Sequence, residues 1–514
     1  MFTTSLLDLL QQHPPGATAI VQGNNVITTG TLLDESQRLA AGLQSLGLQA
    51  GDTVVLAALP DAGFIRIVYA AMCCGLRLAV IDPEMGRDNY REKLRQLQPR
   101  WAFVDARLLF LQEHPWLRRL YFAWSKKGMY FPAGSGVQVI ATGPPIPLRQ
   151  PHTRLQRLFN RPPSPEQQPA QLPDDTEFLI TYTSGTTSTP KGVVHSLGAL
   201  TASIGAIARL FEGSQNRRLA AHLPYFALIA LQAGMEAHLW NHRWSAARKL
   251  RFIEKHGITT LFGPPCDYLP LVQWCERKSR QLPACLQHLS FGSAPVHRAF
   301  LERLIAVLPP HVRLDCLYGM TENLLVARID GREKAQLPTL AGDILGYPAP
   351  GVELRLAADG EILVRSPQTY TRYLHLDSRD AWHATGDLGC FDAAGRLVLT
   401  GRKKDMIIRR NFNLYPGLYE PTVNRIPGVV ECAFVGVYDP EKHDETVALF
   451  VETQRPITAT ALRRALEAGE FSIDREALPD VILFTELPRR GRQSKVDKAA
   501  LRQRLLSEKT NRRT

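Results

Sequence analysis

Apolar segments of two kinds alternate over the first 135 residues. Residues 53–59 form a continuous apolar run that predicts a buried strand, and residues 64–74 have the spacing of a helix that ends at Gly75. A further apolar run at 78–81 predicts the next strand. Strand, helix and strand in this order predict a parallel sheet covered by helices, and therefore an α/β fold.

The remainder of the chain predicts another α/β part, a β-rich part and a small separate unit. Residues 143–174 are rich in proline, glutamine and arginine, which predicts an exposed connector. A second α/β stretch then runs to about Ala327, followed by short strands and turns through Leu399. The C-terminal part predicts a small α+β unit, with strands at 429–436 and 445–451 and helices at 459–468 and 498–506. We expect two domains, 1–402 and 403–514.

The composition is that of an ordinary globular protein. The chain has 514 residues, too many for one core, and 45% of them are apolar. No apolar run reaches the roughly eighteen residues that a membrane span requires, and the N-terminus lacks the basic start of a signal peptide. The eight cysteines show no zinc-ligand spacing. We therefore expect a cytoplasmic protein with reduced thiols.

The formal net charge of +12 is concentrated in one segment. Between Ala106 and Pro162, nine lysines and arginines accompany a single acid, Glu113, and aromatic residues lie among them. Two interpretations stay open: a solvated basic rim over a core strand and helix, or contact with an anionic membrane surface. No helix-turn-helix, zinc-finger or RNA-recognition signature accompanies the charge, so we expect no nucleic-acid partner.

Residues 181–192 are the most informative segment of the chain. They read Thr-Tyr-Thr-Ser-Gly-Thr-Thr-Ser-Thr-Pro-Lys-Gly, with eight hydroxyl side chains, and directly follow an apolar run. Such a loop can bend around an anion and offer hydroxyls, backbone N–H groups and an ammonium to phosphate oxygens. A Walker loop would need serine or threonine after the lysine, whereas Gly192 follows Lys191. The segment therefore predicts a nucleotide phosphate loop of another kind.

This loop resembles the phosphate-binding signature of the acyl-adenylate-forming (AMP-binding) superfamily, which includes acyl-CoA synthetases, luciferases and peptide-synthetase adenylation domains. Further segments are similar to that family in the same order, from about Gly51 to Arg502: residues 223–227, 291–295, 318–322, 385–389, 401–405 and 487–498. Acyl-CoA synthetases and fatty-acid–CoA ligases are closest in kind. The resemblance implies a large adenylating domain of parallel-type sheets with helices and a β-rich subdomain, and a small mobile domain that carries a catalytic lysine.

The resemblance also implies an ATP site. Asp387, on a tight turn, would accept hydrogen bonds from the ribose hydroxyls with Arg402 as its partner, and the Tyr318 ring would stack on the purine. The phosphate loop and two other segments would supply the remaining ATP-binding residues: Thr183, Ser184, Gly185, Thr186, Thr187, Lys191, Gly292, Ser293, Ala294, Gly319 and Met320.

Three residues are implied in the chemistry and one in domain motion. Glu322 offers a hard oxygen ligand for Mg²⁺ bridging the phosphates, and Thr321 would lie near the α-phosphate. Lys495, on a flexible basic loop, would bridge the substrate carboxylate and the α-phosphate as oxygen attacks phosphorus. Lys404 is implied as the hinge about which the C-terminal domain rotates between two half-reactions.

Three positions depart from the family pattern. Ser188 stands where the family usually has its second loop glycine, and Ala227 stands where many members carry histidine. Asn411 replaces a glycine that lines the family's pantetheine tunnel, the path of the acceptor thiol. The resemblance implies an acyl pocket that contains Tyr225, Phe226 and Gly234. Their apolar or small character favours a fatty or aryl acid over an amino acid.

The sequence therefore predicts an ATP- and Mg²⁺-dependent carboxylate ligase. It would form acyl-AMP with release of pyrophosphate and then transfer the acyl group to a thiol, for which coenzyme A is preferred. The phosphopantetheine of an acyl carrier protein is the alternative acceptor. From another class, a non-catalytic nucleotide-binding or membrane-peripheral protein on a retained scaffold stays open, because fold alone does not guarantee activity.

Overall fold

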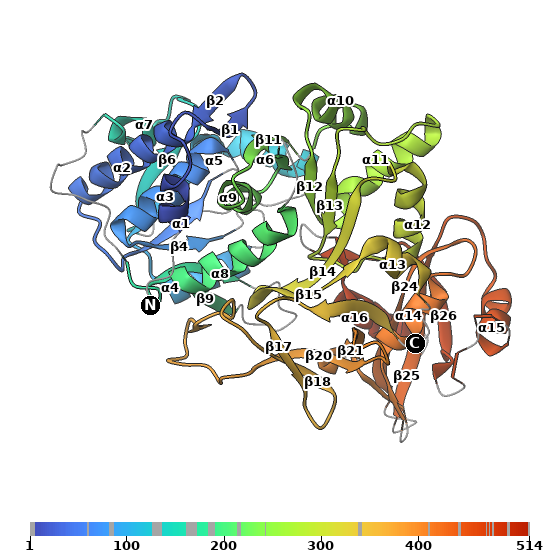
Figure 1. Cartoon of the computed structure of the whole chain (residues 1–514). Coiled ribbons are helices and arrows are strands. Elements are labelled where there is room, and N and C mark those ends of the chain that lie inside the picture. Colours follow the sequence, from blue (N-terminus) through green and yellow to red (C-terminus); the bar gives the residue numbers. More distant parts are fainter. Residues whose placement is uncertain are drawn as a thin grey trace.

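The computed structural model describes most of the chain. The described residues are 6–58, 61–81, 87–125, 136–160, 172–182, 191–212, 217–241, 243–337, 342–409, 412–439, 444–468, 470–471, 473–474, 477–490 and 494–511. They form two large sheets and a three-stranded sheet with helices packed on them (Figure 1).

The first large sheet has eight strands in the order β19-β9-β8-β4-β3-β5-β6-β7. Its bounds are β3 (Thr53–Ala57), β4 (Arg77–Val80), β5 (Trp101–Asp105), β6 (Gln138–Thr142), β7 (Thr153–Arg154), β8 (Glu177–Tyr182), β9 (Gly192–Ser196) and β19 (Arg372–Tyr373). Strands β3 to β8 run parallel, whereas β9 and β19 are antiparallel to their neighbours. Helix α3 (Ala62–Cys74) connects β3 and β4 and ends at Gly75, whose φ of +67° is readily adopted by glycine. The predicted strands, helix and parallel pairing of this region are confirmed.

The second large sheet has thirteen strands in the order β17-β18-β20-β21-β16-β15-β14-β13-β12-β10-β11-β1-β2. One half is parallel, from β11 to β14, and the half from β14 to β17 is antiparallel. Its bounds are β1 (Thr18–Gln22), β2 (Asn25–Thr28), β10 (Arg218–Ala221), β11 (Glu236–Leu239), β12 (Thr260–Gly263), β13 (His288–Phe291), β14 (Arg313–Met320), β15 (Asn323–Asp330), β16 (Asp343–Pro348), β17 (Glu353–Leu356), β18 (Glu361–Arg365), β20 (His383–Phe391) and β21 (Leu397–Arg402). The antiparallel half is the predicted β-rich part.

Helix α8 (Leu197–Ala208) joins the two large sheets. It contacts β8 and β9 of one sheet and β15 of the other, and ten of its twelve residues are buried. Ser196 caps its N-terminus by accepting a hydrogen bond from the Ala199 N–H. The other helices up to residue 340 are α1 (Leu6–Gln11), α2 (Thr29–Ser45), α4 (Arg87–Leu97), α5 (Ala106–Glu113), α6 (Pro115–Ser125), α7 (Leu155–Leu158), α9 (Pro224–Gln232), α10 (Ala246–His256), α11 (Pro265–Arg277), α12 (Arg298–Val307) and α13 (Gly331–Gln336). Within the described residues, no helix has both the length and the apolar character to cross a membrane.

The C-terminal elements, orange and red in Figure 1, surround their own three-stranded sheet. They are β22 (Ile407–Arg409), β23 (Phe412–Leu414), α14 (Pro416–Val423), β24 (Val429–Asp439), β25 (Asp444–Thr453), α15 (Ala459–Glu467), β26 (Val481–Phe484), β27 (Arg489–Arg490), β28 (Lys495–Val496) and α16 (Lys498–Asn511). The predicted strands and helices are confirmed, and β26, which pairs parallel with β25, was not predicted. The domain boundary between residues 402 and 403 stays a prediction.

The middle of the predicted connector is packed rather than exposed. Strand β7 pairs with β6, and α7 buries Leu155 and Leu158, so that Leu158 lies where a side chain at Gly42 of α2 would collide with it. The prediction of an exposed connector was wrong here because this apolar pair outweighs the surrounding polar composition. Residues 161–171 lie outside the described part.

Candidate active site

The middle of β20 holds a buried carboxylate between two partners, so the predicted tight turn at Asp387 is an extended strand segment. Asp387 and Arg402 are register partners on β20 and β21, and Arg402 Nε lies 2.7 Å from Asp387 Oδ1. Tyr318 Oη donates to Asp387 Oδ2 at 2.7 Å. Gly386, with a φ of +73°, donates its N–H to Glu361 Oε1 at 2.8 Å, which ties this part of β20 to β18. The structure thus brings the predicted ribose-binding pair together, while contact with ribose stays a prediction.

The backbone is tightly constrained at two positions that line the cleft. A β-carbon at Gly319 would lie 2.0 Å from the Leu324 carbonyl oxygen, and Ser293 has a φ of +66°, which is uncommon for serine. Five of the predicted nucleotide-contacting residues line one cleft here: Gly292, Ser293, Ala294, Gly319 and Met320. Tyr318 is not part of that lining, because it lies behind it with its hydroxyl on Asp387. Stacking of its ring on a purine stays a prediction.

Thr321 and Glu322 form the two-residue loop between β14 and β15, since Met320 and Asn323 are register partners. Both line the cleft, and Tyr373 Oη donates to Glu322 Oε1 at 3.1 Å. Burial raises the pKa of Glu322, opposed by the Tyr373 hydrogen bond and by the charges of Lys191 and Arg402. The carboxylate is therefore desolvated and surrounded by groups that favour its charged form.

The residues of the cleft fit a Mg²⁺ ion that arrives with phosphate. Among the described residues, no group of three or more histidine, cysteine or acidic side chains could hold a metal alone. Mg²⁺ commonly takes one or two carboxylates, with substrate phosphates and water completing its coordination. Glu322 supplies one such carboxylate, so it would hold the ion only in company with the nucleotide.

Lys495 reaches the same cleft from the C-terminal part of the chain. It lies on β28, whose partner β27 pairs Arg490 with it, and it lines the cleft together with Asp387, Arg402 and Lys404. Desolvation lowers the pKa of Lys495, and the charges of Arg402 and Lys404 lower it further while Asp387 opposes them. Desolvation and Arg402 likewise lower the pKa of Lys404. Three cations gathered on one cleft form a site for an anion with several charges.

The cleft has a volume of about 2700 Å³, and the part of its lining that α8, α9 and Phe262 contribute is apolar and is here called the apolar arm. Tyr225 lines it, together with Leu200, Ile204, Ile207, Leu228, Ile229 and Phe262. Phe226 does not, because α9 turns it into the core, where it is 1% exposed and its ring lies 4.7 Å from that of Phe262. Gly234 follows the end of α9 with a φ of +67°, and a β-carbon there would meet His13. Neither Phe226 nor Gly234 lines the cleft, since one lies in the core and the other ends a helix, and their role in an acyl pocket stays a prediction.

The structure adds two histidines that the sequence analysis did not single out. His222, directly after β10, has its Nε2 2.9 Å from Asp267 Oδ2 on α11, and both residues line the cleft. His195 on β9 is 4% exposed, lines the cleft and makes a hydrogen bond with the Thr321 backbone. The two-residue period of a strand, which puts His195 on the same face as Lys191, was a usable signal.

Of the predicted phosphate loop, the structure places Lys191 but not the residues before it. Lys191, the last predicted member of the phosphate loop, is described and has its ammonium 5.4 Å from the centre of the Tyr373 ring. Thr183, Ser184, Gly185, Thr186 and Thr187 lie outside the described residues, as do Ser188 and Asn411. Their roles stay predictions.

Stability is expected to fall in mild acid because two histidines are buried without charge. Burial lowers the pKa of His195 and His383 from 6.5 to about 4. The unfolded chain takes up these protons near pH 6.5, whereas the folded chain does so only near pH 4. The stabilisation is therefore complete above pH 6.5 and is lost as the pH falls towards 4, by up to about 1.4 kcal/mol per pH unit for each histidine. Urea unfolding between pH 7 and 4.5 would measure this slope, which should decrease in His383→Gln but not in a variant of the exposed His311, His311→Gln.

Comparison with known proteins identifies the family. The model of the family described as AMP-binding enzyme matches residues 8–374. An indoleacetate–CoA ligase of Aromatoleum aromaticum is 28% identical over 96% of this chain and 96% of its own length. A 3-[(3aS,4S,7aS)-7a-methyl-1,5-dioxo-octahydro-1H-inden-4-yl]propanoyl:CoA ligase of Mycobacterium tuberculosis is 33% identical over 65% of this chain and 67% of its own.

A solved structure shows the same fold. The o-succinylbenzoate coenzyme A synthetase of Bacillus subtilis, in complex with ATP and a magnesium ion, has a TM-score of 0.75 at 20% identity and covers 94% of this chain and 96% of its own. The sequence-based assignment to the adenylate-forming fold is confirmed. The chain thus belongs to the AMP-binding enzyme family and is an AMP-forming ligase of the acid–thiol kind.

Proposed function

We propose that the chain activates a carboxylic acid with ATP and Mg²⁺ to acyl-AMP, and transfers the acyl group to coenzyme A. The observation that carries this proposal is the convergence of the Asp387–Arg402 pair, Glu322 and Lys495 on one cleft with an apolar arm. Such a cleft offers a ribose acceptor, a metal ligand and a cation to a nucleotide, and a dry wall to an acyl group.

Each group would act at a different part of the reacting pair. Asp387 would accept hydrogen bonds from the ribose hydroxyls and so orient the α-phosphate towards the apolar arm. Glu322 would hold Mg²⁺, which neutralises phosphate charge when bound. Lys495 would stabilise the charge that develops as the carboxylate oxygen attacks phosphorus and pyrophosphate leaves. Rotation of residues 403–514 about Lys404 would then present another face for thiol transfer.

A fatty or aryl acid is the substrate class that the cleft favours. Its arm has aliphatic walls contributed by α8 and α9, and the indoleacetate–CoA ligase named above acts on an aryl acid by its name. Acid-dependent exchange of pyrophosphate into ATP across a panel of alkyl, aryl and amino acids tests this assignment. Nucleotide binding without exchange for any acid would instead support the non-catalytic alternative.

Coenzyme A is the proposed acceptor, with an acyl carrier protein as the alternative. Both named relatives are CoA ligases, and this supports the proposal for the present chain. Thioester formation from the best acid, measured with free coenzyme A and with phosphopantetheinylated carrier protein, separates the two. A carrier-only product would reverse the assignment.

A peripheral contact with anionic membrane is a second proposal. Helix α6 exposes Trp116 by 62% and Leu120 by 61%, and Arg118 and Arg119 beside them are also exposed. Apolar and basic side chains together suit the headgroup layer, where each basic residue contributes roughly 1 kcal/mol. We expect sedimentation with phosphatidylserine-containing vesicles at low salt, and its loss in Trp116→Ser/Leu120→Ser. Equal sedimentation of both proteins would leave the basic segment as a solvated face.

A further inference from the structure

Residues 370–374, here called the strap, tie the first large sheet to the loop that carries Glu322. Strap residues Arg372 and Tyr373 form β19, which pairs antiparallel with Val194 and Val193 of β9. The Tyr370 N–H donates to the Glu322 carbonyl at 2.8 Å, and the Leu374 N–H donates to the Gly192 carbonyl at 2.8 Å. One short segment therefore hydrogen-bonds to the backbone of both Glu322 and the residue after Lys191.

Tyr373 makes the same connection with its side chain. Its hydroxyl donates to Glu322 Oε1 at 3.1 Å, and the Lys191 ammonium lies 5.4 Å from its ring centre. The face of a tyrosine ring attracts a cation, and a hydroxyl bound to a carboxylate restricts its rotation. A single rigid side chain thus contacts a metal-binding carboxylate and a phosphate-binding lysine that come from different sheets.

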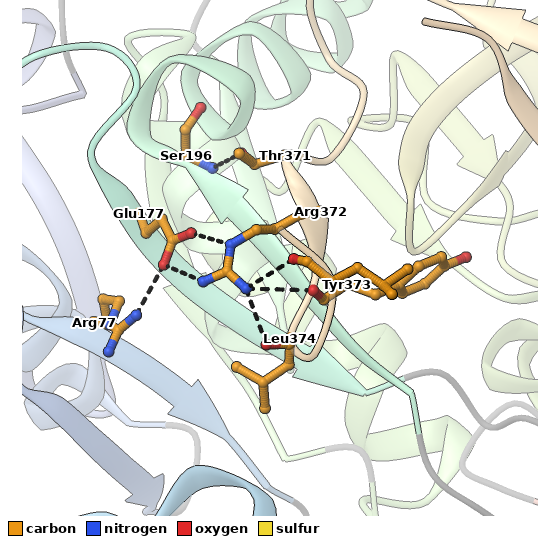
Figure 2. A network of polar contacts seen from close by, with 8 residues as sticks. Arg77, Glu177, Ser196, Thr371, Arg372, Tyr373 and Leu374 are labelled. Atoms are coloured by element: carbon orange, nitrogen blue, oxygen red, sulfur yellow. Dashed lines mark hydrogen bonds and ion pairs between the residues drawn. The ribbon is translucent and has the colours of Figure 1, made fainter. Parts of the chain in front are cut away.

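A charged network holds the strap in place (Figure 2). Glu177 on β8 accepts from Arg77 Nη1 at 2.8 Å and from Arg372 Nη2 at 2.9 Å, and it lies between the two guanidinium groups. Arg372 also donates to the Leu374 carbonyl at 2.9 Å and to the Leu376 carbonyl at 3.2 Å. Its guanidinium therefore holds the backbone of the strap and of the residues that directly follow it. Figure 2 shows the Tyr373 ring directed away from this network.

We propose that Tyr373 is a positioning residue that sets Glu322 and Lys191 relative to each other, and that the Arg77–Glu177–Arg372 network fixes Tyr373. The inference rests on the proposed function, because it assigns Glu322 to Mg²⁺ and Lys191 to phosphate. It goes beyond that function because Tyr373, which connects Glu322 and Lys191, lies outside the segments that resemble the family. Tyr373 would act through Glu322 and Lys191, which its side chain touches.

Two substitutions at Tyr373 separate its two contacts. Tyr373→Phe removes the hydroxyl, and with it the hydrogen bonds to Glu322 and to the Tyr370 side chain. Tyr373→Leu also removes the ring beside Lys191. The readout is the dissociation constant of ATP by calorimetry, with MgCl₂ and with EDTA. Tyr373→Phe should lower the gain in ATP affinity that Mg²⁺ provides by about tenfold, with little change in EDTA. Tyr373→Leu should weaken ATP binding in both.

The control variants remove a tyrosine hydroxyl or a carboxylate charge at positions outside the cleft and the strap. Tyr419→Phe deletes a hydroxyl that donates to Asp474 Oδ2 at 2.7 Å, away from the cleft lining. Glu177→Gln should reproduce part of the Tyr373→Phe effect, about threefold, whereas Glu353→Gln, which breaks an exposed arginine pair, should not. Thermal unfolding checks that each variant is folded.

The outcomes are distinct from those of the proposed function. If Tyr373→Phe and Tyr419→Phe have the same Mg²⁺-dependent gain, Tyr373 has no positioning role and the inference is overturned. If Tyr373→Phe is affected but Glu177→Gln is not, the anchoring part is wrong. Absence of acid-dependent exchange in the parent protein would refute the proposed function, while the ATP-binding measurement would still decide the role of Tyr373.

Discussion

Replacing Lys495 by alanine is expected to lower acyl-adenylate formation at least about a hundredfold, the scale of one preorganised electrostatic contact. The reason is the position of its ammonium, in the cleft beside Arg402 and Asp387, where desolvation has already lowered its pKa. Single-turnover formation of acyl-AMP from ATP and acid measures the loss. Thiol transfer from supplied acyl-AMP should be far less affected, because that step no longer involves attack on phosphorus.

A matched lysine replacement makes this result specific. Lys255→Ala removes an exposed lysine of α10 that is not part of the cleft lining, and both half-reactions should stay within twofold of the parent. Equal loss of both half-reactions in Lys495→Ala would show that Lys495 is structural.

The Asp387→Asn variant should bind ATP about a hundredfold more weakly. The change removes the charge that pairs with Arg402 and replaces one of the two carboxylate oxygens by an NH₂ donor, so the proposed acceptor of the ribose hydroxyls is weakened and its geometry is disturbed. The KM for ATP should rise much more than kcat falls. Equilibrium binding of AMP, which carries the ribose without the outer phosphates, measures the same loss without turnover.

Asp392→Asn is the control for this variant. Asp392 directly follows the C-terminal end of β20 and pairs with Arg396 at 2.7 Å, so the substitution breaks the same kind of ion pair outside the cleft. Similar losses of AMP affinity in both variants would mean that Asp387 acts through the stability of the sheet.

Most of the fold and of the nucleotide end of the site was predictable, because each rests on local signals. The strand at 53–57 is marked by its own apolar run, and the following helix by its apolar spacing and by Gly75 at its end. Asp387 and Arg402 were recognisable as neighbours because their motifs recur in a fixed order. The hydrogen bond from Tyr318 to Asp387 could not be predicted, since 69 residues separate the hydroxyl from its acceptor.

The acyl end was harder to predict because a motif fixes order but not direction. Tyr225 and Phe226 are neighbours in α9, yet the rotation of about 100° between adjacent helix residues directs Phe226 into the core and leaves Tyr225 on the cleft. Tyr373 carries no local signal: its importance arises from pairing between β19 and β9, which are far apart along the chain. Such long-range contacts are set by packing rather than by the residues next to them.

The two-residue loop between β14 and β15 also limits how this protein can vary. Thr321 and Glu322 occupy it completely, and Gly319 before it admits no β-carbon. An inserted or deleted residue would change the register of β15 and turn its core side chains to the opposite face. Redesign for a new acid should therefore keep the sequence and length of this hairpin unchanged. Substitutions should be introduced at the aliphatic positions of α8 and α9.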